Sequence, residues 1–257
     1  MAQLHADPTC SRRLKLASVL ELFLERLTWP EVEAAIAGGW RRAIVCCASS
    51  EQHGPHLPEA TDALLGAAYS ERLANRLGDA LIAPVIRPGC SEHHMGFAGS
   101  LTIPPSVLMD LLDAYIDSLR RHGFERFVVF SSHGGNFPVL AEWAKTRPLP
   151  GVTVISDFAI FDAAFEAIRR FGRNDRAGPH AELIETSMML RLHPELVKIE
   201  LAEPGFTGPM PLEELLAKGM RAISPNGVIG DPVRATAEIG EAVLEALVER
   251  LAGAVRN

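Results

Sequence analysis

The sequence has few cysteines, no uninterrupted apolar run and no positive net charge, and each absence excludes a class of protein. The four cysteines among 257 residues form no CxxC pair, so we interpret them as reduced thiols of a cytoplasmic protein. The net charge of −7 argues against nucleic acid or an anionic membrane as the main partner. The apolar stretch at residues 14–27 contains four charged residues. It therefore predicts an amphipathic helix rather than a membrane span or a signal peptide.

Apolar residues, in contrast, make up 47% of the chain and can bury a sizeable core. They predict strands at residues 42–48, 81–86, 126–131 and 152–156, and helices at 19–27, 28–36, 62–77, 106–121, 138–145, 157–172, 181–192 and 235–255. Residues 201–234 are rich in glycine and proline and predict a loop or lid. The alternation predicts one α/β domain over residues 1–257, with a mostly parallel sheet covered on both faces and residues 1–27 as an N-terminal extension.

Metal-capable side chains follow two of the predicted strands, at the sheet edge where ligands bind in such folds. Glu51 and His53 follow the first strand, Asp62 begins the next helix, and His133 follows the strand at 126–131. Positions i and i+2 of an extended segment share a face, so Glu51 and His53 can converge. Carboxylates and imidazoles suit divalent zinc, manganese or iron, and Asp62 can bridge two ions. The alternative is that these residues form turns and helix caps on a polar surface.

Two further polar clusters bear on the same site. His180 and Glu185 are five residues apart, and both can reach one site if His180 lies just before the helix. Glu185 would then be a metal ligand and His180 a proton shuttle. The alternative is an acidic residue that favours the helix N-terminus and a histidine on the surface. His94 lies in a loop that can line the pocket, and we expect Asn136 to hold its own turn together.

These stretches, taken together and in order, resemble the creatininase family of metal-dependent amidohydrolases. The resemblance rests on LTWPE at 27–31, EQHGPHLP at 51–58 with TD at 61–62, HMGFAGS at 94–100, SHGGN at 132–136, His180 with ETS at 185–187, and GVIGDP at 227–232. It implies a three-layer α/β/α subunit, commonly a homohexamer, with two divalent metal ions (Zn, Mn or Fe) and a small-molecule substrate.

The resemblance also implies the ligands of both ions. Carried over by position, one ion would be held by Glu51, Asp62 and His133, and the other by His53 and Asp62. Creatininase itself has a glutamate where this chain has Gly135, so a replacement carboxylate is needed. Glu185 is the candidate, as in the HGGN branch of the family, and Glu182 is the reserve. His180 matches the catalytic histidine that is thought to pass a proton to the departing nitrogen.

A second departure from creatininase concerns the substrate. Creatininase has a tryptophan four residues before its catalytic histidine, and this chain has Arg176 there. A guanidinium suits a carboxylate or phosphate better than the flat creatinine ring. Arg176 and His94 are therefore the expected substrate-binding residues, and creatinine is not the expected substrate. Relatives of the HGGN type include a peptidase that trims the mycofactocin precursor peptide, a formamide deformylase and a hydrolase of oxidised inositol.

The expected function is a metal-dependent amidohydrolase. Hydroxide held by two metals would attack the carbonyl carbon of a small non-creatinine amide, cyclic amides included, and break its C–N bond. One alternative is a peptidase that trims a short peptide such as a mycofactocin precursor. Another is a hydrolase of a cyclic ketone or lactone. A non-catalytic binding relative is a further alternative, against which the intact set of Glu51, His53, Asp62 and His133 argues.

Overall fold

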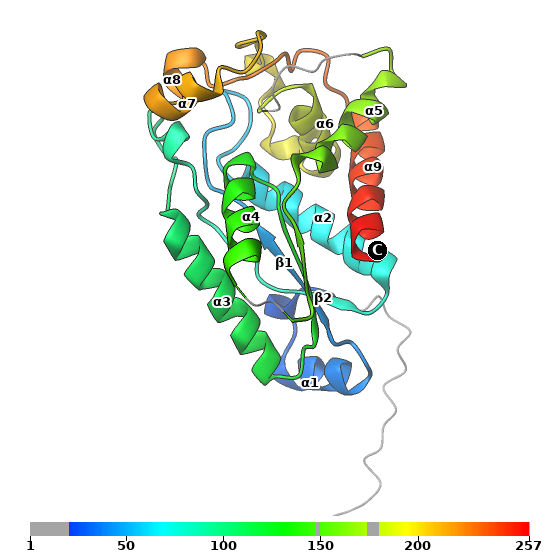
Figure 1. Cartoon of the computed structure of the whole chain (residues 1–257). Coiled ribbons are helices and arrows are strands. Elements are labelled where there is room, and N and C mark those ends of the chain that lie inside the picture. The colour runs from blue at the N-terminus through cyan, green and yellow to red at the C-terminus, as the bar shows by residue number, and fades with distance from the viewer. Residues whose placement is uncertain (1–20, 148–149, 174–179, 257) are drawn as a thin grey trace, which may run out of the picture.

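A four-stranded parallel sheet lies at the centre of the computed structural model, which describes residues 21–147, 150–173 and 180–256 (Figure 1). Its strands are β1 (Arg42–Cys47), β2 (Ala80–Ile82), β3 (Arg126–Ser131) and β4 (Val152–Ile155). Their order is β2-β1-β3-β4, and all three pairings are parallel. The predicted α/β fold with a mostly parallel sheet is confirmed.

Helices cover both faces of this sheet. One face packs against α2 (Thr61–Leu77), α5 (Asp162–Arg169), α6 (Leu183–Leu192) and α9 (Ala237–Arg256). The other packs against α1 (Trp29–Ala37), α3 (Pro105–Arg121) and α4 (Phe137–Thr146). The short helices α7 (Leu212–Lys218) and α8 (Met220–Ile223) lie at the end of the molecule opposite α1 (Figure 1).

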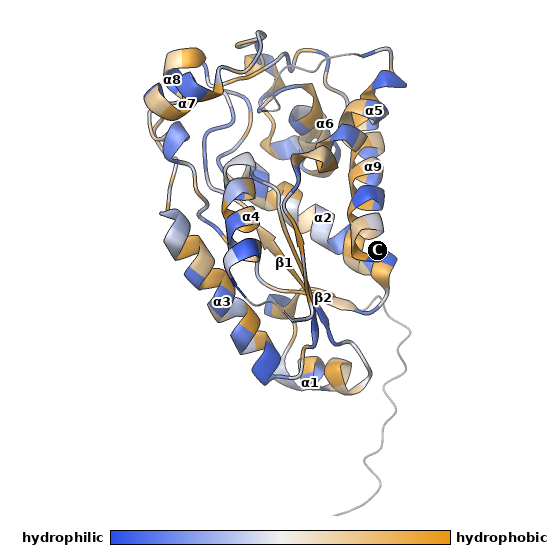
Figure 2. Cartoon of the chain, in the orientation of Figure 1, coloured by the Kyte–Doolittle hydropathy of each residue, from blue (hydrophilic) through white to orange (hydrophobic). Residues whose placement is uncertain are grey.

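The alternation of side chains along β1 explains the two cores. Ile44 and Cys46 belong to the core beneath α2 and α9, whereas Val45 and Cys47 belong to the core beneath α3 and α4. Successive side chains of a strand point to opposite faces, so a strand buried on both faces must be apolar throughout. Helices such as α3 and α4, in contrast, are buried on one side only. Figure 2 shows apolar colouring along β1 and mixed colouring along the helices. Cys46 and Cys47 are free and buried, as predicted.

Short 3-10 helices complete the described fold. They are η1 (Leu24–Arg26), η2 (Glu92–His94), η3 (Gly134–Asn136), η4 (Phe158–Phe161), η5 (Pro194–Leu196) and η6 (Ile199–Leu201). Two of them, η2 and η3, follow directly on loops that contribute to the site below. Within the described segments, every helix is too short or too polar to cross a membrane.

The predicted helix at 19–27 is wrong in its described part. The backbone N–H of Ile82 donates to the carbonyl of Leu22 at 2.8 Å, and Phe23 pairs with Ile82 in a parallel bridge. Only η1 follows. Because β2 lies at the edge of the sheet, its free backbone groups accept this segment as an additional partner. The predicted loop at 201–234 likewise contains α7 and α8.

Candidate metal centre

The parallel register of β1 and β3 sets the position of the site. Cys47 pairs with Ser131, so the two strands end side by side at one edge of the sheet. Glu51 and His53 lie in the loop after β1, and His133 lies directly after β3. Asp62 is in the first turn of α2. These side chains are buried and meet at the carboxyl edge of the sheet, where the sequence predicted them.

The side chains form two ligand sets that share Asp62. In the first set, Nδ1 of His133 lies 3.1 Å from Oε1 of Glu51 and 3.2 Å from Oδ2 of Asp62. In the second, Nε2 of His53 lies 3.2 Å from Oδ1 of Asp62 and 3.7 Å from Oε2 of Glu185. Within each set, one potential ligand atom from each residue lies within 4.8 Å of the others. The two oxygens of Asp62 thus serve different histidines.

Backbone carbonyls fix the orientation of both histidines. Nδ1 of His53 lies 3.0 Å from the carbonyl oxygen of Glu51, and Nε2 of His133 lies 3.2 Å from that of Cys90. Each outer nitrogen donates its N–H to that carbonyl, so when the ring is neutral its lone pair is on the inner nitrogen, which faces the carboxylates. An N–H held outward by a carbonyl is the usual arrangement of a histidine that binds a metal.

The donor atoms themselves fit a divalent cation. Oε2 of Glu51, Nε2 of His53 and Oδ2 of Asp62 are buried and accept or donate no hydrogen bond within the described residues. Buried polar atoms are normally hydrogen-bonded, because leaving them without a partner costs free energy. All three atoms belong to residues of the two ligand sets, and nitrogen with carboxylate oxygen is a donor combination that suits zinc, manganese and iron. The residues present therefore fit a metal centre.

The buried carboxylates and histidines of the cluster shift one another's pKa values strongly. Burial raises the pKa of Glu185 to about 7. Burial alone would lower the pKa of His53, but the carboxylates of Asp62 and Glu185 outweigh it and raise the value to about 10. Burial also opposes ionisation of Asp62, yet His53 and His133 hold its pKa well below the usual range. Without a metal, protons on the two histidines take the place of the cationic charge that these carboxylates require.

His180 lies just before α6, as the spacing to Glu185 requires. Its Nε2 is 2.8 Å from the carbonyl oxygen of Gln52, and its Nδ1 faces Oε1 of Glu51 at 3.9 Å. Burial and the charge of His53 lower the pKa of His180 to about 3, so the ring is neutral at pH 7. With Glu51 and His53, it also forms a third group of potential metal ligands.

The backbone between His180 and α6 has an unusual conformation. Ala181 is buried and has φ of 56°, a left-handed value that a residue with a Cβ rarely adopts. This conformation directs the N–H of Ala181 at Oε2 of Glu185, 2.5 Å away. Strained backbone of this kind concentrates at functional sites, and here it orients the carboxylate that faces His53.

Glu182, the reserve ligand, has another role in the structure. Its side chain caps α6 by accepting a hydrogen bond from the N–H of Ile184 at 2.8 Å. Within the described residues, Glu185 belongs to a group of potential metal ligands and Glu182 does not. The geometry thus favours Glu185 as the carboxylate of the second ligand set.

The packing around Gly135 explains why this chain has no glutamate there. A Cβ at this position would lie 2.3 Å from the carbonyl oxygen of Cys90 and 2.5 Å from Nε2 of His133. Real Cβ atoms do not approach other atoms so closely. The glycine therefore allows the carbonyl of Cys90 to hold His133.

One sequence expectation around the site is wrong, and one residue was missed. The Asn136 side chain was expected to hold its own turn, but it donates to the carbonyl of Ala48 at 3.1 Å and accepts from the N–H of Cys90 at 2.9 Å. It thus joins three loops at the sheet edge. Gln52 was missed, although it lies between two predicted ligands. Its Nε2 is 2.9 Å from Nδ1 of His94, and its Oε1 accepts from Gly54.

The two expected substrate-binding residues have different outcomes. His94 is buried, with Nε2 at 3.3 Å from Oε1 of Glu51, and it lines the cavity over the centre. Arg176 lies outside the described residues. The cavity has a volume of about 1220 Å³ and is bordered by Glu51, Asp62, His133 and Glu185 from the ligand sets. A substrate that enters it can reach the cluster.

Comparisons with known proteins show the family of the whole chain. The family model Creatininase (creatinine amidohydrolase) matches residues 25–255. The mycofactocin precursor peptide peptidase of Mycobacterium ulcerans is 32% identical over 82% of each chain. The creatinine amidohydrolase of Pseudomonas putida is 30% identical over 92% of this chain and 96% of its own. The solved structure "Creatininase Mn" is 27% identical with a TM-score of 0.71, over 92% of this chain and 98% of its own.

Proposed function

Because this chain belongs to the creatininase family and is therefore a hydrolase, we propose that it uses two divalent metal ions to cleave the C–N bond of a small amide other than creatinine. The observation that carries the proposal is the pair of ligand sets that share Asp62. Glu51, Asp62 and His133 would hold one ion, and His53, Asp62 and Glu185 the other. We expect zinc, manganese or iron at both positions.

The chain's own residues bind and orient the reactants around that pair. When bound, two divalent ions would polarise a substrate carbonyl and lower the pKa of water. Neutral His180 would take a proton from the attacking water at Nδ1, which faces Glu51, whereas its Nε2 lies 2.8 Å from the carbonyl oxygen of Gln52. From that position it delivers the proton to the departing nitrogen. Glu51, Asp62 and His94 are buried and border the cavity through which a substrate can reach the cluster.

Release of a short peptide is the second candidate function. The cavity of about 1220 Å³ is larger than a single small ring requires, since pockets for drug-sized ligands span roughly 300–1,000 Å³. The relative from Mycobacterium ulcerans is named a mycofactocin precursor peptide peptidase, and a peptide bond is also an amide. The same cluster can therefore serve either substrate.

We place the enzyme in the cytoplasm as a homohexamer. Large apolar side chains on its surface support association, because exposed apolar patches commonly mark contacts between proteins. Leu212 and Leu216, one turn apart on α7, are 60% and 72% exposed. Sedimentation velocity tests the assembly, and a monomer at micromolar concentration would contradict it.

Metal binding and hydrolysis are tested together on the purified wild-type chain. The protein is reconstituted with zinc, manganese or iron, bound metal is measured by mass spectrometry, and hydrolysis is measured with creatinine, small linear and cyclic amides, and short peptides. We expect two ions per chain and hydrolysis of an amide or peptide, with creatinine left intact. Absence of bound metal after reconstitution would overturn the mechanism. Two bound ions without any hydrolysis would favour a non-catalytic binding role.

A further inference from the structure

Six residues that border the cavity over the metal centre belong to one apolar core and have no role in the proposed reaction. They are Tyr69, Phe161, Phe165, Ile184, Met188 and Leu247, and the part of the cavity beside them is called the inner chamber. These residues belong to α2, η4, α5, α6 and α9, the elements on one side of the sheet. Apart from the Tyr69 hydroxyl, their side chains are hydrocarbon or thioether. An apolar pocket with a single polar group is typical of a site that binds an apolar ligand in a fixed orientation.

The inner chamber adjoins the second ligand set. Tyr69 follows Asp62 by seven residues on α2, two helical turns, so the two side chains share a face. Met188 follows Glu185 by three residues on α6 and shares its face in the same way. Helices α2 and α6 pack together in the same core. A substrate carbonyl at the ligand sets can therefore have an attached group in the chamber.

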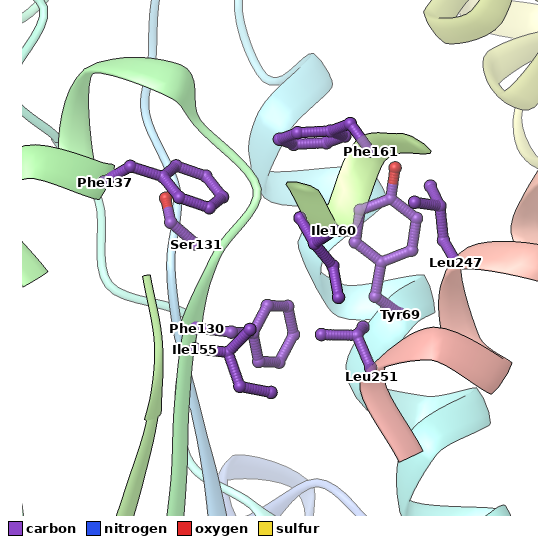
Figure 3. Close-up of a pocket in the computed structure, with 9 residues that line it drawn as sticks. All are labelled: Tyr69, Phe130, Ser131, Phe137, Ile155, Ile160, Phe161, Leu247 and Leu251. Carbon is purple, nitrogen blue, oxygen red and sulfur yellow. The ribbon is translucent and has the colours of Figure 1, made fainter. Parts of the chain in front are cut away.

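The hydroxyl of Tyr69 has a weak hydrogen-bond acceptor within the protein. It donates to Sδ of Met188 at 3.2 Å, and a thioether is a weak acceptor. Tyr69 is only 5% exposed, and a buried hydroxyl normally has a strong partner. In Figure 3 the hydroxyl points toward Phe161 and Leu247. These three residues also border a second, smaller cavity of about 10 Å³, which is about the size of one water probe.

We propose that the inner chamber binds an apolar, ring-sized group of the substrate, and that the Tyr69 hydroxyl donates a hydrogen bond to a neutral acceptor on that group. The proposal rests on the proposed hydrolysis, and it narrows the substrate to amides with an aryl or comparable apolar arm. The acceptor is neutral because the chamber residues include no cation and the carboxylates of Asp62 and Glu185 lie nearby. An oxygen acceptor would replace the thioether of Met188.

The test compares three probes with the zinc-reconstituted enzyme: acetamide, N-(4-methylbenzyl)acetamide and N-(4-methoxybenzyl)acetamide. The two benzyl probes are similar in size, and only the second has an ether oxygen. The chain has two tyrosines, Tyr69 and Tyr115, so fluorotyrosine labelling gives two ¹⁹F resonances that Tyr115→Phe assigns. Tyr115 is on α3 and packs in the opposite core, which makes Tyr115→Phe the matched control.

We expect both benzyl probes, but not acetamide, to shift the Tyr69 resonance and leave that of Tyr115 in place. The methoxy probe should bind about three- to tenfold more tightly than the methyl probe, the usual effect of one hydrogen bond. Tyr69→Phe should abolish this difference, and Tyr115→Phe should retain it. A structural role of Tyr69 would weaken both benzyl probes equally, which would overturn the proposal.

Two other outcomes would also overturn the chamber proposal. They are an unchanged Tyr69 resonance with both benzyl probes up to their solubility limit, and a methoxy preference that survives in Tyr69→Phe. Hydrolysis of the amide and peptide panel is scored separately. If the panel is hydrolysed but neither benzyl probe binds, the chamber proposal is overturned and the proposed hydrolysis stands. If the benzyl probes bind with the expected preference but no amide is hydrolysed, the chamber proposal is supported and the proposed amide hydrolysis is overturned.

Discussion

Nε2 of His53 lies 3.2 Å from Oδ1 of Asp62, although the two residues belong to a loop and to the helix that follows it. The second oxygen of Asp62 lies 3.2 Å from Nδ1 of His133, which comes from the neighbouring strand. One carboxylate therefore connects two imidazoles from separate strand ends. Its removal is expected to affect both ligand sets together.

Asp62→Asn tests this shared role, because it keeps the shape of the side chain and removes its charge. We expect loss of both ions and a fall of more than about 100-fold in hydrolysis, since each set loses an anionic ligand. Metal per chain is measured by mass spectrometry beside Asp79→Asn. Asp79 pairs with Arg42 and Arg126 at the other end of the strands, and that variant should retain its metal. An Asp62→Asn protein with full metal content would refute the bridging role.

Glu185→Gln and Glu182→Gln form a matched pair at the start of α6. Glu185 faces His53, whereas Glu182 caps the helix through the N–H of Ile184. We expect Glu185→Gln to reduce the bound metal from about two ions per chain to about one, and Glu182→Gln to leave it unchanged. Titration with zinc followed by mass spectrometry measures this. The reverse result would transfer the ligand role to Glu182.

His180→Asn separates proton transfer from metal binding. If His180 moves a proton at Nδ1, the variant should retain its metal and lose about 10²- to 10⁴-fold in kcat. Metal content and steady-state rates with the best substrate of the panel are measured on the same preparation. Because His180 also forms a group with Glu51 and His53, a fall in metal content would show that it acts as a ligand instead.

The stability of the metal-free protein should fall as pH rises from 6.5 to 9.5. The pKa of His53 is raised to about 10 and that of Glu185 to about 7, so the folded state retains protons that the unfolded chain releases. The stabilisation from His53 is complete below its ordinary value of about 6.5 and is lost as pH rises through 10, with a slope of at most ~1.4 kcal/mol per pH unit for one proton.

Urea unfolding at several pH values measures this dependence, with the zinc-loaded protein as the control. Metal ligation requires a neutral histidine, so the loaded protein should become more stable over the same range. Equal stability of the metal-free protein at pH 6.5 and 9.5 would contradict the assignment of His53 as a buried, protonated partner of Asp62.

Periodicity in the sequence predicted the sheet because β1 and β3 are apolar on both faces and the intervening helices are amphipathic. It also predicted that side chains at adjacent strand ends would meet, since the carboxyl ends of parallel strands share an edge. The predicted helix at 181–192 corresponds to α6, with His180 before it and Glu185 in its first turn. Local patterns were sufficient for these features.

Other features depend on contacts between segments that are distant in the sequence. The pairing of Phe23 with Ile82 replaces a helix that local propensity favours, because an open sheet edge is available only in the folded chain. The left-handed Ala181 has no local signal, since alanine does not favour that conformation. Asn136 was assigned to a turn, although its partners are Ala48 and Cys90.

The crowding at Gly135 has an evolutionary consequence. A single substitution there to glutamate would introduce a Cβ that collides with Cys90 and His133, before the new carboxylate could serve as a ligand. The loop that contains Cys90 would have to move in the same step. With this loop in place, glutamate at position 135 would require a second, compensating change, whereas a carboxylate from α6, such as Glu185, already faces His53 without one.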